Sequence, residues 1–242
     1  MFLTNPCYHN LRVFEPWVRH FISGKSVILL GSAPSVVNVK ADFMESFQII
    51  VRVNNYRHFN SCTRTDIFYS MMGGSIMKTP GDLKKDGVKF IFCKNPFRQI
   101  TVLNPDGSKN YLQSVDCRGS YISSKNSRIK WFEIPYYLQT EKNWRWLTAK
   151  INKISTTGLA ALVDIHRYKP SKMHVAGFDF FSSGFHNIDM PCHIKPWPKH
   201  HDFLAEMLFA KDYIAEHGIT CDSTMQKIFA HPKQFPKIGN KP

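Results

Sequence analysis

The sequence predicts an α/β fold: a single domain, residues 1–242, in which a parallel sheet is flanked by helices and carries a small lid or insert. Short continuous apolar runs typical of strands buried on both faces recur along the chain. Segments with helical spacing lie between several of them, as in βαβ units. The length of 242 residues and the 43% hydrophobic content suit one domain with a sizeable core.

The predicted strands fall into two groups. The first group comprises residues 27–30, 49–53, 65–70 and 88–95. The second comprises residues 173–176 and a short last strand in ITCDS. Helices between the strands would complete right-handed crossovers and keep all strands parallel.

Three segments are predicted as helices. Residues 10–22 place apolar side chains at helical spacing. A second helix opens at Ser155, Thr156 or Thr157, any of which is a suitable N-cap residue. A third, in HDFLAEMLFAKDYIAEHG, is amphipathic and is closed by Gly218.

Residues 96–150 do not fit the alternation of strands and helices. They are rich in lysine, arginine and aromatic residues, and their hydrophobic periodicity is poor. We therefore expect this segment to form a lid or insert over one end of the sheet.

Composition limits the classes of partner and compartment. The chain has 32 Lys and Arg against 18 Asp and Glu, a net charge of +14, which favours phosphate-rich partners. The six cysteines are scattered without a C-x-x-C pair, so neither a disulfide framework nor a zinc site is indicated. No apolar run approaches the roughly 18 residues of a membrane span, and no signal peptide is evident, so we expect no stable membrane insertion and a cytoplasmic protein.

The turn Gly31-Ser32-Ala33-Pro34-Ser35 follows the first predicted strand and is expected to open a helix. Glycine permits close backbone approach, and a helix N-terminus presents N–H groups to an anion. The turn is not the G-x-G-x-x-G of dinucleotide sites. An ordinary strand-to-helix turn with a serine cap is the alternative.

Further polar clusters follow other predicted strands or begin helices. Asn54 and Asn55 follow the second strand, and STTG at 155–158 begins a helix. GFDFF follows the strand at 173–176 and contains Asp179, whose carboxylate could accept ribose hydroxyl groups. Carboxyl ends of parallel strands share one edge of the sheet, where open α/β folds bind ligands. The clusters together predict a nucleotide site, while simple turn chemistry is the alternative for the asparagines.

The stretch HHDFLAE contains the candidate general base. His201 begins an H-x-x-x-x-E spacing that ends at Glu206. Imidazole titrates near neutrality, which suits proton abstraction. His200 is the alternative base, Asp202 is interpreted as a helix-start acid, and a solvated helix-start histidine is the alternative to any catalytic role.

The order of these motifs, GSAPS, VRVNN, STTG, GFDFF and H-x-x-x-x-E, resembles the sialyltransferase superfamily. The likeness is to the bacterial enzymes of glycosyltransferase family 42 and, more loosely, to family 29. It covers roughly residues 25–70 and 153–225. It implies a Rossmann-like GT-A variant with a small lid, and metal-independent, inverting transfer from CMP-sialic acid.

The resemblance also implies roles for individual residues. His201 would be the general base. Glu206 is the candidate catalytic partner if an irregular helix start lets its carboxylate approach the imidazole, and otherwise it supports the helix. The residues that would contact the nucleotide-sugar are Gly31, Ser32, Ser35, Asn54, Ser70, Thr156, Thr157, Gly158, Gly177, Phe178 and Asp179.

The sequence departs from the family pattern around the donor sugar and the leaving group. Ser32 stands where the bacterial family usually has asparagine, and Phe181 where it has the first leaving-group tyrosine. Lys153 or Ile154 replaces an expected arginine. The donor is therefore expected to be either a UDP-sugar or a CMP-sugar.

Residues before the candidate base offer replacements for the missing tyrosine. The leaving-group candidates are His193, Lys195 and Lys199, each of which could equally be an ordinary loop residue. No Asp-x-Asp motif is present, which argues against the usual Mg or Mn arrangement, and no cofactor is expected.

The acceptor is predicted from the charge. Basic residues interleaved with aromatics suit a nucleic-acid surface, and they include Lys78, Lys84, Lys85, Lys94, Arg98, Arg118, Lys125, Arg128, Lys130, Lys142 and Arg145. For the insert, the alternative is a solvated lid whose aromatic residues anchor it to the core. Our leading hypothesis is a phage-type enzyme of the host cytoplasm that glycosylates a hydroxylated pyrimidine flipped out of double-stranded DNA. The alternatives are a sialyltransferase acting on a bacterial surface glycan such as lipooligosaccharide, and a non-catalytic nucleotide- or DNA-binding module. No residue indicates an oligomeric state.

Overall fold

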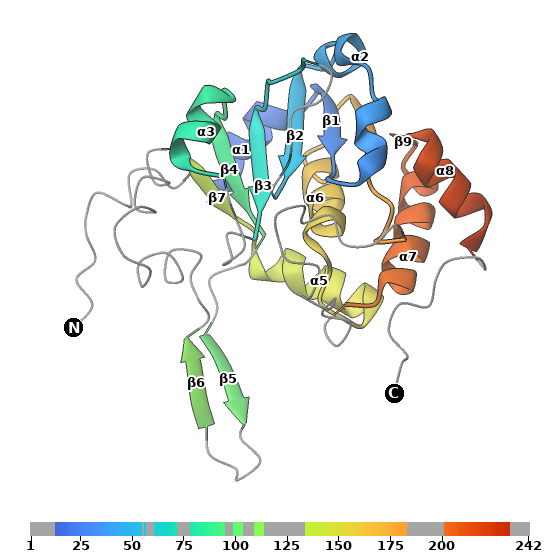
Figure 1. Cartoon of the computed structure of the whole chain (residues 1–242). Coiled ribbons are helices and arrows are strands. Elements are labelled where there is room, and N and C mark those ends of the chain that lie inside the picture. Colours follow the sequence, from blue (N-terminus) through green and yellow to red (C-terminus); the bar gives the residue numbers. More distant parts are fainter. Residues whose placement is uncertain are drawn as a thin grey trace.

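The computed structural model describes residues 13–54, 56, 61–71, 78–94, 99–103, 109–113, 134–182 and 201–232. Seven strands form one sheet in the order β7-β4-β3-β2-β1-β8-β9, and every neighbouring pair is parallel (Figure 1). Helices flank this sheet on both faces. The prediction of a Rossmann-like α/β domain is confirmed.

The strands of the sheet lie at or close to the predicted runs, with β7 in addition. Their bounds are β1 (Ser26–Leu30), β2 (Ile49–Val53), β3 (Ile67–Ser70), β4 (Phe90–Cys93), β7 (Tyr136–Leu138), β8 (Lys172–Ala176) and β9 (Thr220–Cys221). Two further strands, β5 (Gln99–Leu103) and β6 (Lys109–Gln113), pair antiparallel with each other.

The helical segments include the three that were predicted. Their bounds are α1 (Glu15–Ile22), η2 (Pro34–Asn38, a 3-10 helix), α2 (Ala41–Glu45), α3 (Pro80–Lys85), α5 (Glu141–Ile151), α6 (Thr157–His166), α7 (Phe203–Glu216) and α8 (Ser223–Ala230). No helix among the described residues is both long and apolar enough to cross a membrane.

Both faces of the sheet are covered, which explains why its strands are continuously apolar. In β1, Val27 and Leu29 pack into a core shared with α1, α5, α6, α7 and α8. Ile28 and Leu30 point to the other face and pack against residues of η2 and α2. Because successive side chains of a strand point to opposite faces, a strand buried on both sides cannot alternate with polar residues.

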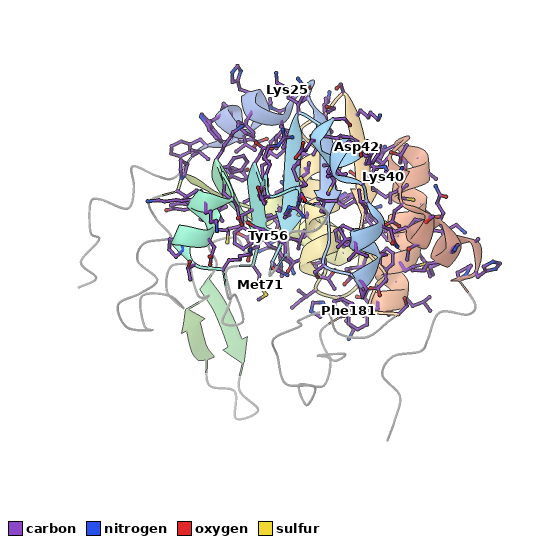
Figure 2. The ribbon with its side chains drawn as sticks, turned by 45° about the horizontal axis from the view of Figure 1, so that its top comes forward. Lys25, Lys40, Asp42, Tyr56, Met71 and Phe181 are labelled. Carbon is purple, nitrogen blue, oxygen red and sulfur yellow. The ribbon has the colours of Figure 1, made fainter. Side chains whose placement is uncertain are left out.

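The direction in which strands are added reverses between β1 and β8. From β1 the chain adds β2, β3, β4 and β7 on one side, and then returns to place β8 and β9 on the other. Met71, which follows β3, and Phe181, which follows β8, lie along the same edge of the molecule in Figure 2, opposite Lys25, which precedes β1. The carboxyl edge at such a reversal is where open α/β folds bind ligands.

The structure narrows the insert predicted over residues 96–150. Residues 136–138 form β7, which pairs with β4 inside the main sheet. The helix α5 follows, and its Leu147 and Ile151 are buried in the core. These residues therefore belong to the domain itself, while residues 114–133 lie outside the described part of the chain.

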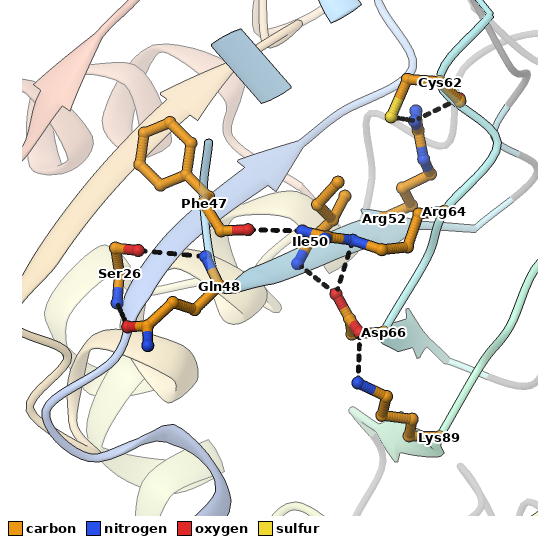
Figure 3. A network of polar contacts seen from close by, with 9 residues as sticks. All are labelled: Ser26, Phe47, Gln48, Ile50, Arg52, Cys62, Arg64, Asp66 and Lys89. Carbon is orange, nitrogen blue, oxygen red and sulfur yellow. Dashed lines mark hydrogen bonds and ion pairs between the residues drawn. The ribbon is translucent and has the colours of Figure 1, made fainter. Parts of the chain in front are cut away.

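A buried carboxylate ties together the starts of neighbouring strands (Figure 3). Asp66 accepts the backbone N–H of Ile50 at 2.9 Å. Lys89 Nζ lies 2.8 Å and Arg64 Nε 3.4 Å from its carboxylate oxygens. The two cations are partly exposed to water, so we expect most of the stabilisation to come from the hydrogen bond to the buried Ile50.

Replacing Asp66 with alanine is expected to lower the free energy of unfolding by about 2 kcal/mol, because the buried N–H of Ile50 loses its acceptor. Denaturant titration of the purified variant measures the change. The control is Glu45→Ala, since Glu45 is exposed on α2, and its effect should stay within about 0.5 kcal/mol. Equal effects of the two substitutions would contradict this role for Asp66.

Candidate active site

Two glycines bring the turns after β1 and β8 into backbone contact. Gly31 N–H donates to Ala176 O at 2.8 Å, and Ala33 N–H donates to Gly177 O at 2.9 Å. A Cβ atom at Gly31 would lie 2.2 Å from Gly177 O, which is far inside van der Waals contact. Gly31 is therefore required by the close approach of the two turns, whether or not a ligand also lies against it.

The ring of Phe178 fills the space between this turn and the start of α6. A Cβ atom at Gly158 would lie 2.4 Å from Phe178 Cε1, and one at Gly31 would lie 3.1 Å from Phe178 Cδ1. Phe178 thus packs against both Gly31 and Gly158, and all three residues were predicted to contact the nucleotide. Close packing accounts for the glycine at position 158 without reference to a ligand.

The serines of the first turn lie beside this contact. The turn opens the 3-10 helix η2, which has five residues, in place of a full α-helix. Ser35 lies within η2, and its hydroxyl oxygen is buried without a hydrogen-bond partner among the described residues. Ser32 is half-buried in the turn itself.

Asn54 and Ser70 are brought together at the ends of β2 and β3. Ser70 Oγ donates to Asn54 Oδ1 at 3.3 Å. Asn54 adopts a left-handed backbone conformation with φ of 51°, and its N–H donates to Tyr69 O at 3.0 Å. The turn chemistry considered as the alternative for Asn54 is present, and the pair lies at the carboxyl ends of β2 and β3.

The loop after β8 is held by two carboxylates, one from α8 and one of its own. Gly177 N–H donates to Asp222 Oδ2 at 2.7 Å, which joins the loop to the N-cap residue of α8. Asp179 is buried, and its Oδ1 accepts the N–H of Phe181 at 3.0 Å. One oxygen of the predicted ribose acceptor therefore stabilises the loop. Phe181 packs against Phe203 at the start of α7, with ring centroids 4.6 Å apart.

The start of α6 is bound by a carboxylate from α7. Glu206 is buried, and its Oε1 accepts the N–H of Thr156 at 2.8 Å while its Oε2 accepts the Thr156 hydroxyl at 2.6 Å. Thr156 is the N-cap residue of α6. The N–H and the hydroxyl group of Thr156 are thus both hydrogen-bonded within the protein. The N–H groups of Thr157 and Gly158 have no acceptor among the described residues, so a ligand at this helix start would meet those two groups.

His201 is oriented by a backbone carbonyl group. Its Nδ1 lies 2.7 Å from Ile154 O, and because a carbonyl oxygen can only accept, Nδ1 carries the hydrogen. In the neutral ring Nε2 is then the acceptor. Glu206 Oε1 lies 3.7 Å from Nδ1, and 24% of the His201 side chain is exposed. Asp202 caps α7 by accepting the N–H of Ala205 at 2.9 Å, as predicted for a helix-start acid.

Lys94 belongs to the site although it was predicted to be a surface base. It follows β4 and is buried, and its Nζ donates to Ser155 O. Burial lowers the pKa of Lys94 to about 8, and the charges of Glu206 and Asp164 partly offset this. Its position directly after the apolar run FIFC was the available sequence signal, because such a residue lies at the carboxyl edge.

The helix α6 contains a buried acid, Asp164. Tyr69 OH donates to Asp164 Oδ2 at 2.6 Å. Burial raises the pKa of Asp164 to about 6, against smaller opposing effects that include the Tyr69 hydrogen bond and the Arg167 charge. An aspartate in the otherwise apolar helix sequence TGLAALVDIH is the sequence signal for this buried acid.

The remaining predicted residues lie outside the described part of the chain. They are Asn55, His193, Lys195, Lys199 and the alternative base His200. Five basic residues of the predicted nucleic-acid surface also lie outside it: Arg98, Arg118, Lys125, Arg128 and Lys130. Within the described residues, no cluster of three or more His, Cys, Asp or Glu side chains could hold a metal ion.

Comparison with known proteins adds nothing to this geometry. No protein-family model matches the chain, and a search of curated proteins finds no match either. The functional interpretation consequently depends on the motifs of the chain and on their arrangement.

Replacing Gly31 with alanine is expected to destabilise the protein by about 1–3 kcal/mol, because the new methyl group would collide with backbone atoms. The control is Gly81→Ala. Gly81 lies in α3, where the nearest atom to an added Cβ is Thr79 Oγ1 at 3.6 Å. That change is expected to stabilise by about 0.5 kcal/mol through the lower entropy of the unfolded chain. Thermal unfolding compares the two, and a neutral Gly31→Ala would contradict the contact.

The buried Asp164 predicts a pH effect on stability. Its pKa is raised from 3.8 to about 6 in the folded state, so its contribution is fully present below pH 3.8 and is lost as the pH rises through 6. The stability of the protein relative to an Asp164→Asn variant should therefore fall between these values and then level off. Urea titrations of both proteins across this range measure the difference. A difference independent of pH would contradict the raised pKa.

Proposed function

We propose that the protein is a metal-independent, inverting glycosyltransferase that uses a nucleotide-sugar donor and has His201 as its general base. The orientation of His201 carries the proposal: Nδ1 donates to Ile154 O at 2.7 Å, which directs the proton-accepting role to Nε2. His201 binds the segment before α6, and Lys94, directly after β4, binds the same segment. The ring is therefore close to the carboxyl edge of the sheet, where this class of fold binds ligands.

The reaction follows from this assignment. Nε2 of His201 removes the proton of the acceptor hydroxyl as its oxygen attacks the anomeric carbon. The bond from that carbon to the nucleotide phosphate breaks, and the nucleotide leaves with the bonding electrons. Orientation of donor and acceptor supplies much of the rate. The leaving phosphate would be stabilised by His193, Lys195 or Lys199, which precede His201 in the chain.

The placement of the donor is proposed from the resemblance to the sialyltransferase superfamily. The residues implied to contact the nucleotide surround the reversal between β1 and β8 and the start of α6. Glu206 has a different role from that of a simple partner of the base, because its two oxygens bind Thr156. We therefore propose that Glu206 supports both the helix start and the histidine.

The acceptor that we propose is a hydroxylated pyrimidine in double-stranded DNA. The net charge of +14 supports a polyanionic acceptor. Two of the lysines named for this surface are less available to DNA than expected. Lys94 is buried, and Lys78 lies 3.4 Å from Asp86 and over the ring of Tyr56. We propose that the other lysine and arginine residues of the set contact the DNA. A phage-encoded enzyme would act in the host cytoplasm.

The test is incubation of the protein with a panel of UDP- and CMP-sugars. Each donor is offered with hydroxymethylated DNA and with a lactosyl acceptor, and products are read by mass. We expect transfer to DNA, and a loss of about 10²- to 10⁴-fold in turnover for His201→Ala, the range of general-base catalysis. The control is His20→Ala, since His20 is exposed on α1 before the amino end of β1 and should leave turnover unchanged.

Each other outcome has a defined meaning. Transfer to the lactosyl acceptor alone would exclude the DNA acceptor and leave a sialyltransferase-like enzyme of surface glycans. Undiminished turnover of His201→Ala would remove the base assignment. Binding of nucleotide or DNA without any transfer would favour the non-catalytic module.

A further inference from the structure

Three consecutive residues before α6 each have a backbone group bound by a different side chain. Ile154 O accepts from His201, Ser155 O accepts from Lys94, and Thr156 N–H donates to Glu206. We call residues 154–156 the strap. We infer that Lys94 is a positioning residue for His201 and acts through the carbonyl group of Ser155. The inference deepens the proposed function, since it rests on His201 being the base.

Lys94 is itself fixed by the sheet. Its backbone N–H donates to Ser70 O at 2.9 Å, which continues the pairing of β3 and β4. Only 4% of Lys94 is exposed, and Ser155, which accepts from its Nζ, is 2% exposed. The ammonium group therefore links the sheet to the strap inside the protein.

The strap lies between α5 and α6 and belongs to neither helix. It follows Asn152, the left-handed C-cap residue of α5 with φ of 53°, and ends at Thr156, the N-cap residue of α6. If Lys94 lost its ammonium group, the buried carbonyl of Ser155 would lack this donor. A buried carbonyl without a donor is costly, so the backbone is expected to turn toward another one. Ile154 is the adjacent residue, and its carbonyl would turn with it.

The charges around Lys94 support a fixed position for the ammonium group. Glu206 and Asp164 both act on it and oppose the effect of burial on its pKa. Arg167 Nη1 lies 4.0 Å from Asp164 Oδ1. Lys94 thus also compensates buried carboxylates, which is a purely structural role. A test must separate that role from positioning of the imidazole.

The test compares Lys94→Met with the parent protein by NMR of proteins labelled with ¹⁵N at histidine and at the backbone. In the parent we expect the His201 ring to carry its hydrogen on Nδ1. In Lys94→Met we expect the ratio of the Nδ1–H to the Nε2–H tautomer to fall by about fivefold, as for the loss of one hydrogen bond of ordinary strength. Amide hydrogen exchange of Thr156 should accelerate more than that of the sheet.

The matched control is Lys85→Met, since Lys85 is an exposed lysine in the last turn of α3. It should change neither the tautomer ratio nor the exchange of Thr156. A purely structural role predicts that Lys94→Met lowers the melting temperature and accelerates exchange throughout the sheet, with the tautomer ratio unchanged. That result would overturn the inference.

A second pair of proteins covers the case in which Lys94→Met does not fold. Lys94→Met is then made in a Glu206→Gln background and compared with Glu206→Gln alone. In that background, loss of the Lys94 ammonium group leaves no buried negative charge at position 206. The same fall in the tautomer ratio is expected, and an unchanged ratio again overturns the inference.

Kinetics distinguish this inference from the proposed function. If the protein is a glycosyltransferase, Lys94→Met should lower kcat by about 10- to 100-fold, the cost of a misplaced catalytic group, with little change in KM for the donor. An increase in KM without a fall in kcat would contradict positioning of the base. The NMR result requires no substrate, so absence of transferase activity would overturn the proposed function and leave the structural link from Lys94 to His201 standing.

Discussion

The close approach of Gly31 and Gly177 is the constraint on which the carboxyl edge depends. The turns after β1 and β8 bond to each other there, at the point where the sheet changes its direction of growth. Phe178 leaves the second turn and reaches Gly158 at the start of α6. Glu206 then binds that helix start to α7, which places His201 at the same edge. Segments distant in sequence are therefore positioned by packing that begins with two glycines.

Most of the sheet could be predicted from the sequence because burial on both faces produces continuous apolar runs. The strand β1 shows this directly. Its residues Val27 and Leu29 pack into the core on one face of the sheet, and Ile28 and Leu30 pack into the core on the other. The strand β7 could not be recognised in the same way. It has three residues, and its tyrosines suit a strand or an aromatic lid equally well. Its place in the sheet is set by pairing with β4, which is a tertiary contact.

The edge to which the site residues belong could be predicted, but their partners could not. A polar residue after an apolar run lies at the carboxyl end of a strand, and that rule located Gly31, Asn54 and Gly177. It gives no information on whether a polar group faces a ligand or another part of the chain. Thr156 binds Glu206 from 50 positions away, and Lys94 is buried although a lysine is usually exposed. Such pairings are properties of the folded chain.

The carbonyl group that orients His201 also bears on how a histidine proposed as a general base is recognised. Catalytic histidines are often sought through an acidic side chain that binds the second ring nitrogen. Here that nitrogen binds the main chain of Ile154, a group that every amino acid possesses. The identity of residue 154 is therefore free to vary as long as the backbone keeps its path. A search for histidine–carboxylate pairs in sequences would assign the orienting role to Glu206 alone and overlook the peptide group that binds Nδ1.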